Sequence, residues 1–186
     1  MYINNGDIDL TNFLDVYIIT NGRESHEYVI ESLKRQKKVC FNFIVFRDLS
    51  LINACNICND CSNSPYYIRL DDDMILHPLA LYYFYATIKN IQSDNAIVHF
   101  CRLWEPWNER VCGAVKVYNR KLTKEIGFEL DNCGKIDKLF KKKSIEKNYD
   151  YHRIGGKTNI VAIHSACSYD DNLRYSKLRN EIKKRN

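Results

Sequence analysis

The stretch Tyr66–Asp73 reads YYIRLDDD, an apolar run that ends in three consecutive carboxylates. Three like charges at the end of a buried strand repel one another and lose hydration unless a cation compensates them. Mg²⁺ and Mn²⁺ favour carboxylate and water oxygens, and they commonly accompany phosphorylated substrates. The stretch therefore predicts a metal-bound phosphate ester or nucleotide, against the alternative of a solvated acidic loop.

Strands and helices alternate along the chain around this stretch. The predicted strands are residues 16–20, 41–46 and 66–70, and the predicted helices are residues 24–36, 51–61 and 79–91. Repeated strand and helix at this interval imply right-handed crossovers and a parallel sheet. The first half of the chain is therefore expected to form a Rossmann-like α/β unit.

Polar groups follow each of these three strands. They are Thr20–Arg23, Arg47–Asp48 and Asp71–Asp73. In a parallel α/β sheet, ligands bind beyond the carboxyl ends of the strands, where the chain passes from strand to loop. One edge of the sheet is therefore the predicted site, although Arg23 or Asp48 alone is more typical of a surface residue or a helix cap.

Several segments together carry a resemblance to a known family. They are Val16–Arg23, Ile30–Gln36, Asn53–Asn59 and Tyr67–Asp73 with Pro78, and, more loosely, Val111–Arg120 and Glu125–Phe128. In this order they resemble the family-2 glycosyltransferases with the GT-A fold. The resemblance implies an α/β chain forming a single Rossmann-like GT-A domain, with a mainly parallel central sheet flanked by helices. It divides the chain into a nucleotide-sugar half (12–95), an acceptor half (96–170) and a basic terminal helix (171–186).

The resemblance also implies roles for individual residues. The nucleotide-binding set is Thr20, Arg23, Asp48, Asp71 and Asp72, and the set for Mn²⁺ or Mg²⁺ is Asp71, Asp73 and His164. Asp71 and Asp73 match the DxD pair, so Asp72 is expected to tolerate asparagine best. A histidine at a strand end, such as His164, is otherwise equally typical of a structural residue.

The implied reaction moves a sugar from a nucleoside-diphosphate sugar, with a UDP-sugar expected, to a glycan, lipid-linked or protein acceptor, with inversion. Such a displacement needs a general base on the face opposite the leaving group. Asp137, before a predicted helix that runs to about Glu146, is the first candidate base, and Asp131 is the second. The family's Glu-Asp pair is not kept, because Ile136 replaces its acidic member. The aromatic segment Trp104–Trp107 is interpreted as a loop that lines a sugar site or covers the core.

Two rivals remain. A haloacid-dehalogenase-like phosphatase would use Asp71 as nucleophile and Asp73 as general acid, with Asp170 and Asp171 as late metal ligands. That motif expects threonine or valine at position 75, where Ile75 stands. A non-catalytic GT-A-like nucleotide-sugar-binding domain is the other rival, because the Glu-Asp pair is missing.

Composition limits the remaining possibilities. The 186 residues, 45% hydrophobic and 27% charged, suit one globular domain. We find no apolar stretch of the roughly 18 to 20 residues that would span a bilayer and no signal-peptide pattern, so a cytoplasmic location is expected. Part of the net charge of +5 lies in the C-terminal segment, which could contact a membrane peripherally, and no nucleic-acid-binding motif accompanies it.

Three of the eight cysteines, Cys55, Cys58 and Cys61, form a CxxCxxC pattern. An iron–sulfur cluster of the bacterial ferredoxin type would need a fourth cysteine followed by proline, and Pro65 stands where that cysteine should be. The alternative is a helix face on which residues three apart pack together. Helix packing is the favoured prediction.

Overall fold

The computed structural model describes residues 1–91, 93–106, 109–131, 135–156 and 159–164. Its strands are β1 (Tyr2–Asn4), β2 (Ile8–Asp9), β3 (Leu14–Thr20), β4 (Val39–Arg47), β5 (Tyr66–Asp71), β6 (Met74–Leu76), β7 (Ala96–Glu105), β8 (Arg110–Asn119), β9 (Asp150–Arg153) and β10 (Ile160–His164). Its helices are α1 (His26–Lys34), α2 (Leu51–Cys61), α3 (Ala80–Asn90), α4 (Arg120–Ile126) and α5 (Ile136–Glu146). The predicted terminal helix 171–186 lies outside the described residues.

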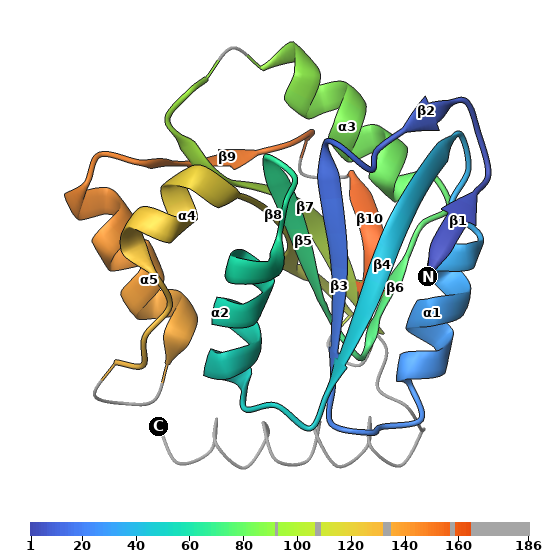
Figure 1. Cartoon of the computed structure of the whole chain (residues 1–186), viewed down its shortest axis with the longest axis horizontal. Helices are drawn as coiled ribbons and strands as arrows, with labels where there is room; N and C mark the ends of the chain where they lie inside the picture. The colour runs from blue at the N-terminus through green and yellow to red at the C-terminus, as the bar shows by residue number, and fades with distance from the viewer. Residues whose placement is uncertain (92, 107–108, 132–134, 157–158, 165–186) are drawn as a thin grey trace.

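Helices cover both faces of the sheet because its central strands are apolar on both sides. Along β3, Val16 and Ile18 join the core cluster that includes α1 and α3 residues, while Tyr17 and Ile19 join the cluster that includes residues of α2, α4 and α5. Figure 1 shows these two groups of helices on opposite sides of the sheet. The α/β class is as predicted. No helix in the described ranges is long and apolar enough to cross a membrane.

The sheet is mixed, so the prediction of a mainly parallel sheet is wrong. Its strand order is β1-β4-β3-β5-β8-β7-β10-β6, with β2 paired to β4 and β9 to β7. The pairs β4/β3 and β3/β5 are parallel, as the crossovers through α1 and α2 require. Beyond β5 the direction changes, because β8 runs antiparallel to β5 and forms an antiparallel hairpin with β7. Alternation of strands and helices predicted only the first half of the sheet.

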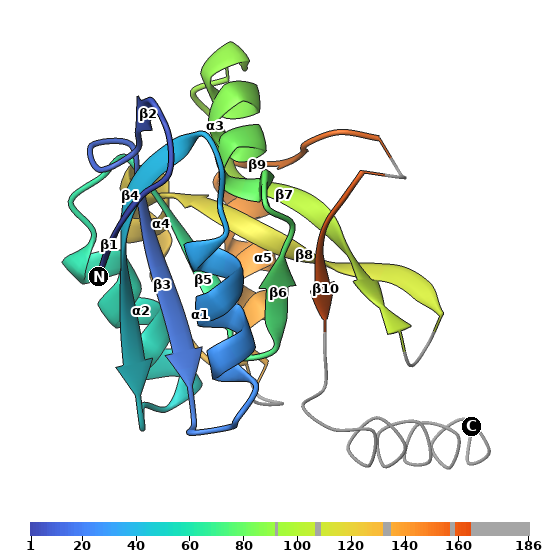
Figure 2. The same cartoon turned by 90° about the vertical axis from the view of Figure 1, so that its right-hand side faces the viewer.

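Strand β10 joins β6, the short strand that follows the acidic triplet, to β7. It pairs antiparallel with β6, where His164 lies opposite Met74, and parallel with β7, where Ile163 lies opposite Trp104. Figure 2 shows β10 between β6 and the β7/β8 hairpin. This register places the end of β10 between the residue after the acidic triplet and the end of β7. Trp104 and Glu105 therefore end a strand rather than forming the predicted loop, and Trp107 lies outside the described residues.

The cysteine helix is as predicted. Cys55 and Cys58 are buried in the α2 core cluster, whereas Cys61 at the end of α2 is exposed. Burial raises the pKa of the Cys58 thiol to about 12, so this side chain stays protonated at neutral pH. Cys55 and Cys58 thus serve packing in this structure.

One buried histidine should make stability depend on pH. The His99 ring on β7 is 1% exposed and packs against the rings of Tyr66 and His152, with centroids 5.8 and 5.6 Å away. Burial, followed by the charge of His152, lowers the pKa of His99 from 6.5 to about 4. The unfolded chain binds a proton at His99 more readily than the folded chain does. The stability associated with neutral His99 is therefore fully present above pH 6.5 and is lost as the pH falls toward 4. We expect His99 to cost about 3 kcal/mol of unfolding free energy over that range.

Urea unfolding at pH 7 and pH 5 measures this effect. The substitution His99→Leu should flatten the pH dependence, whereas His77→Gln, at an exposed position, should leave it unchanged. An equal slope in the parent protein and the His99→Leu variant would contradict the assignment.

Candidate active site

The acidic triplet lies where the predicted strand ends meet. Asp71 ends β5, Asp72 and Asp73 follow it, and the loop after β3 lies beside them because β3 and β5 are parallel neighbours. A pocket of about 260 Å³ opens here. Its lining includes Asn21, Arg23, Leu49, Leu51 and the three aspartates. Two of the three predicted strand-end groups, the loop after β3 and the acidic triplet, therefore line one pocket.

Asp72 holds the loop after β3. This carboxylate is 7% exposed, and its Oδ2 accepts hydrogen bonds from the Thr20 hydroxyl at 3.0 Å and from the Asn21 amide at 3.3 Å. Gly22 follows with a positive φ of 83°, which suits glycine, and its amide donates to the Thr20 hydroxyl at 3.0 Å. Thr20 is 1% exposed, so in this structure it fixes the loop from within. Asp72 thus has a structural role that sequence reasoning did not assign to it.

Asp72→Ala should lower the unfolding free energy by about 1–3 kcal/mol, because a buried hydroxyl and a backbone amide lose their acceptor. Asp72→Asn should cost less, since one carbonyl oxygen remains. Urea unfolding measures both, with Asp60→Ala on the exposed end of α2 as the matched control. An alanine variant as stable as the parent protein would show that Asp72 does not hold the loop.

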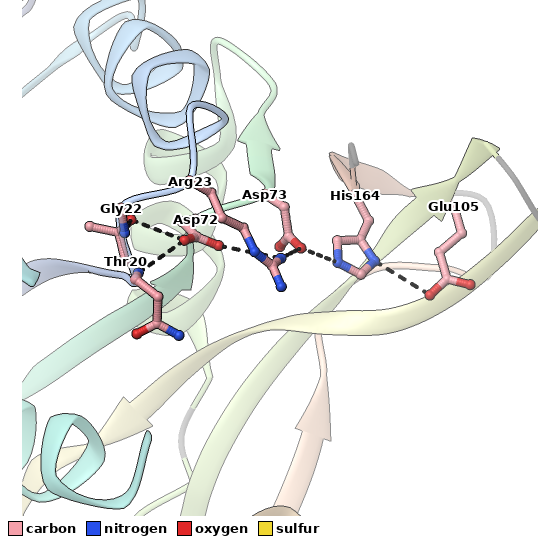
Figure 3. A network of polar contacts seen from close by, with 8 residues as sticks. Thr20, Gly22, Arg23, Asp72, Asp73, Glu105 and His164 are labelled. Carbon is pink, nitrogen blue, oxygen red and sulfur yellow. Dashed lines mark hydrogen bonds and ion pairs between the residues drawn. The ribbon is translucent and has the colours of Figure 1, made fainter. Parts of the chain in front are cut away.

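A chain of polar contacts extends from this loop across the sheet edge (Figure 3). The Arg23 guanidinium lies 3.8 Å from the Asp72 carboxylate and 3.5 Å from the Asp73 carboxylate. On the other side of Asp73, His164 Nε2 lies 3.1 Å from Asp73 Oδ2. His164 Nδ1 lies 3.4 Å from Glu105, which Arg110 approaches to 3.0 Å. The pairing of β10 with both β6 and β7 explains why His164 lies between two carboxylates. Burial alone would lower the pKa of His164, but Asp73 and Glu105 raise it above its ordinary value.

Side chains alternate along a strand, so Asp71 points to the same face of the sheet as Tyr67 and Arg69. Leu70 points to the opposite face. Its side chain is 42% exposed and lies 4.0 Å from the Arg69 Nε atom, while another guanidinium nitrogen of Arg69 contacts the Cys55 sulfur. Burial within the concave site, followed by the charges of Asp73 and Asp137, raises the pKa of Asp71, and Arg69 opposes this. Arg69 is therefore the fixed cation beneath Asp71.

Asp137, the first candidate base, lies near this face. It stands in the first turn of α5 and forms an ion pair with Lys116 of β8 at 2.8 Å. Burial would raise the pKa of Asp137, but Lys116 and then Arg69 hold it below its ordinary value. Because the charge of Asp137 also raises the pKa of Asp71, the two carboxylates are electrostatically linked. Asp137 is therefore within electrostatic reach of Asp71, although it does not line the pocket at the acidic triplet.

Asp48 and Asp131, like Thr20, Asp137 and His164, are predicted site residues that do not line the pocket at the acidic triplet. Asp48 is exposed with a φ of 55°, and its amide donates to the Thr20 carbonyl at 3.3 Å. Asp131 accepts a hydrogen bond from the Lys135 amide at 2.6 Å, in the loop before α5. Asp170 and Asp171 of the phosphatase alternative lie outside the described residues.

The fit of a divalent metal can be judged from the carboxylates themselves. Asp73 Oδ1 is buried and finds no hydrogen-bond partner within the described residues, and a cation would satisfy it. Asp71 lies two residues away on the same pocket wall, and His164 already contacts the other oxygen of Asp73. In the described ranges, however, no three His, Cys, Asp or Glu side chains form a ready metal cluster. The chemistry of the donors fits Mn²⁺ or Mg²⁺. In this structure Arg23 lies beside Asp73, and Arg69 lies beside Asp71.

Comparison with solved structures identifies the fold. The S. aureus TarS structure of residues 1–349 matches with a TM-score of 0.64 and 12% identity, covering 88% of this chain and 63% of that chain. The mannosyltransferase PcManGT from Pyrobaculum calidifontis, in complex with GDP-Man and Mn²⁺, matches with a TM-score of 0.59 and 11% identity, covering 92% and 63%. This chain has a GT-A-like fold.

The matches cover the chains differently, and further solved structures also match. The GT-A-like chain spans less than two thirds of the TarS 1–349 and PcManGT chains. A197 from STIV matches with a TM-score of 0.53 and 11% identity, covering 77% of this chain and 82% of that chain. TarS has also been solved with UDP-GlcNAc, and that complex matches with a TM-score of 0.60. No protein-family model and no curated protein sequence matches this chain.

Sequence reasoning missed Glu105 and Lys116. Glu105 is the one carboxylate in β7, and Lys116 stands between Val115 and Val117 of β8, and these positions are the signal that could have singled them out. Their partners, His164 and Asp137, come from distant segments.

Proposed function

We propose that this GT-A-like chain is a glycosyltransferase that moves a sugar from a nucleoside-diphosphate sugar to an acceptor hydroxyl, with inversion and with a divalent metal. The observation that carries the proposal is the single pocket shared by Asn21, Arg23 and Asp71–Asp73. It combines a cation with carboxylates at the sheet edge where α/β folds bind ligands. The complexes of TarS with UDP-GlcNAc and of PcManGT with GDP-Man and Mn²⁺ support this donor class.

Each residue then has a definable task. Arg23, whose side chain is 48% exposed, can turn from Asp72 and Asp73 toward the diphosphate of the donor. Asp71 and Asp73 would hold the metal, with His164 beside them, and a bound metal would stabilise the negative charge that develops on the departing diphosphate. Asp72 and Thr20 keep the loop that carries Arg23 in place.

The acceptor side depends on Asp137. A general base must take the proton of the attacking hydroxyl on the face of the sugar opposite the diphosphate. Lys116 keeps Asp137 ionised and restricts its orientation through the 2.8 Å ion pair. The same ion pair weakens the basicity of Asp137, and this favours the second candidate function, a nucleotide-sugar-binding domain without turnover.

Release of nucleoside diphosphate from a panel of UDP- and GDP-sugars, with and without Mn²⁺, tests the proposal. Release that depends on Mn²⁺ is expected, with a UDP-sugar as the preferred donor. Thermal stabilisation by UDP and Mn²⁺ without any release would favour the binding domain. Release of phosphate from a phosphomonoester, with no donor bound, would overturn both.

A further inference from the structure

A second pocket, of about 370 Å³, is lined by the candidate base Asp137. Aromatic side chains form much of its wall, including Phe100, Phe140 and Tyr151, and charged groups of Lys116, Asp137 and Lys141 also line it. Phe140 and Tyr151 belong to the core cluster around α2, α4 and α5, on the face to which Arg69 and Asp71 point. The pocket and the acidic triplet thus share Asp137 as an electrostatic neighbour.

The charge in this pocket is unevenly compensated. Lys116 is neutralised by Asp137 at 2.8 Å. Lys141 forms no salt bridge with any carboxylate in the described part of the chain, and its ammonium group lies 5.8 Å from the centre of the Tyr151 ring. A cation over an aromatic ring keeps its charge available to an anionic ligand. Lys141 therefore makes one end of the pocket positive.

The helix sets the distance between the base and this positive end. Asp137 and Lys141 stand four residues apart on α5, so they lie on one face with an axial separation of about 6 Å. A single sugar ring can span that distance. Its hydroxyl would meet Asp137 while a charged substituent on the same ring meets Lys141, and the apolar face of the ring would lie against the aromatic wall.

We propose that this pocket holds the acceptor, and that the acceptor is a sugar carrying an anionic group, a carboxylate or a phosphate, which Lys141 recognises. The proposal rests on the proposed function in assigning Asp137 as the base. Recognition of the anion by Lys141 nevertheless depends only on the pocket and can be measured without turnover.

Ligand-observed NMR with three matched probes tests the proposal. They are 4-nitrophenyl β-D-glucoside, its 6-phosphate and 4-nitrophenyl β-D-glucuronide. At least one of the two anionic probes should bind about five- to tenfold more tightly than the glucoside, and Lys141→Gln should abolish that difference. Tyr151→Leu should weaken all three, because the ring contact is lost. The matched control is Lys142→Gln, whose side chain is 72% exposed and pairs with Glu146 at 3.8 Å.

Equal affinity for the three probes would overturn the proposal, as would an equal effect of Lys141→Gln and Lys142→Gln. UDP titrated with Mn²⁺ into the same samples keeps the two proposals separate. Lys141-dependent glucuronide binding without UDP binding would support the anion-binding pocket and contradict the proposed nucleotide-sugar donor. UDP binding without any preference for the anionic probes would support the donor proposal and contradict the anion-binding pocket.

Discussion

Asp73→Asn is expected to lower the release of nucleoside diphosphate from the preferred nucleotide sugar by at least about 100-fold. Asp73 is the carboxylate on which Arg23 and His164 converge, at 3.5 and 3.1 Å, and its second oxygen is buried without a partner in the described structure. An amide keeps the shape of the side chain but supplies no negative charge to a metal or to His164.

Steady-state assays of diphosphate release measure this effect, with thermal unfolding to confirm that the variant is folded. Asp60→Asn, on the exposed end of α2, changes the same functional group away from the site. Full activity of the Asp73 variant would remove this residue from the metal and phosphate site.

The second large effect is expected from Asp137→Asn. Loss of a general base should reduce transfer to an acceptor by about 10²- to 10⁴-fold. Nucleotide binding should stay nearly intact, because Asp137 lies on α5 and does not line the pocket at the acidic triplet. Transfer rates and UDP affinity, measured on the same preparation, separate these two quantities.

Asp131→Asn is the matched comparison, because Asp131 was the other candidate base. Its carboxylate already accepts a hydrogen bond from the Lys135 amide at 2.6 Å. A loss of transfer in the Asp131 variant, with normal transfer in the Asp137 variant, would reverse the assignment.

The first half of the fold was predictable because its signals are local. Short apolar runs separated by amphipathic segments indicate β3, β4 and β5 with α1, α2 and α3 between and after them. Strand direction in the second half depends on partners far away in the sequence, such as the pairing of Tyr67 with Tyr118. A local pattern does not encode that choice, and the mixed sheet was therefore missed.

The candidate site likewise has a part that the sequence predicts and a part that depends on long-range strand pairing. The strand-end rule brought Arg23 and the acidic triplet together, because it needs only parallel neighbours. The position of His164 between Asp73 and Glu105 depends on β10 pairing with two strands at once, and only the folded chain shows this. Glu105 had been interpreted as part of an aromatic loop for the same reason.

Arg23 gives this chain a tethered counter-ion for its own carboxylates. The folded state should therefore withstand EDTA, unlike small domains that unfold when a chelator removes their structural metal. Under the proposed function, Asp71 and Asp73 would hold the metal, and the Arg23 guanidinium would move away from Asp73 to make room for it. That displacement would offset part of the metal affinity, and the displaced arginine would then be available to the phosphates of the proposed donor.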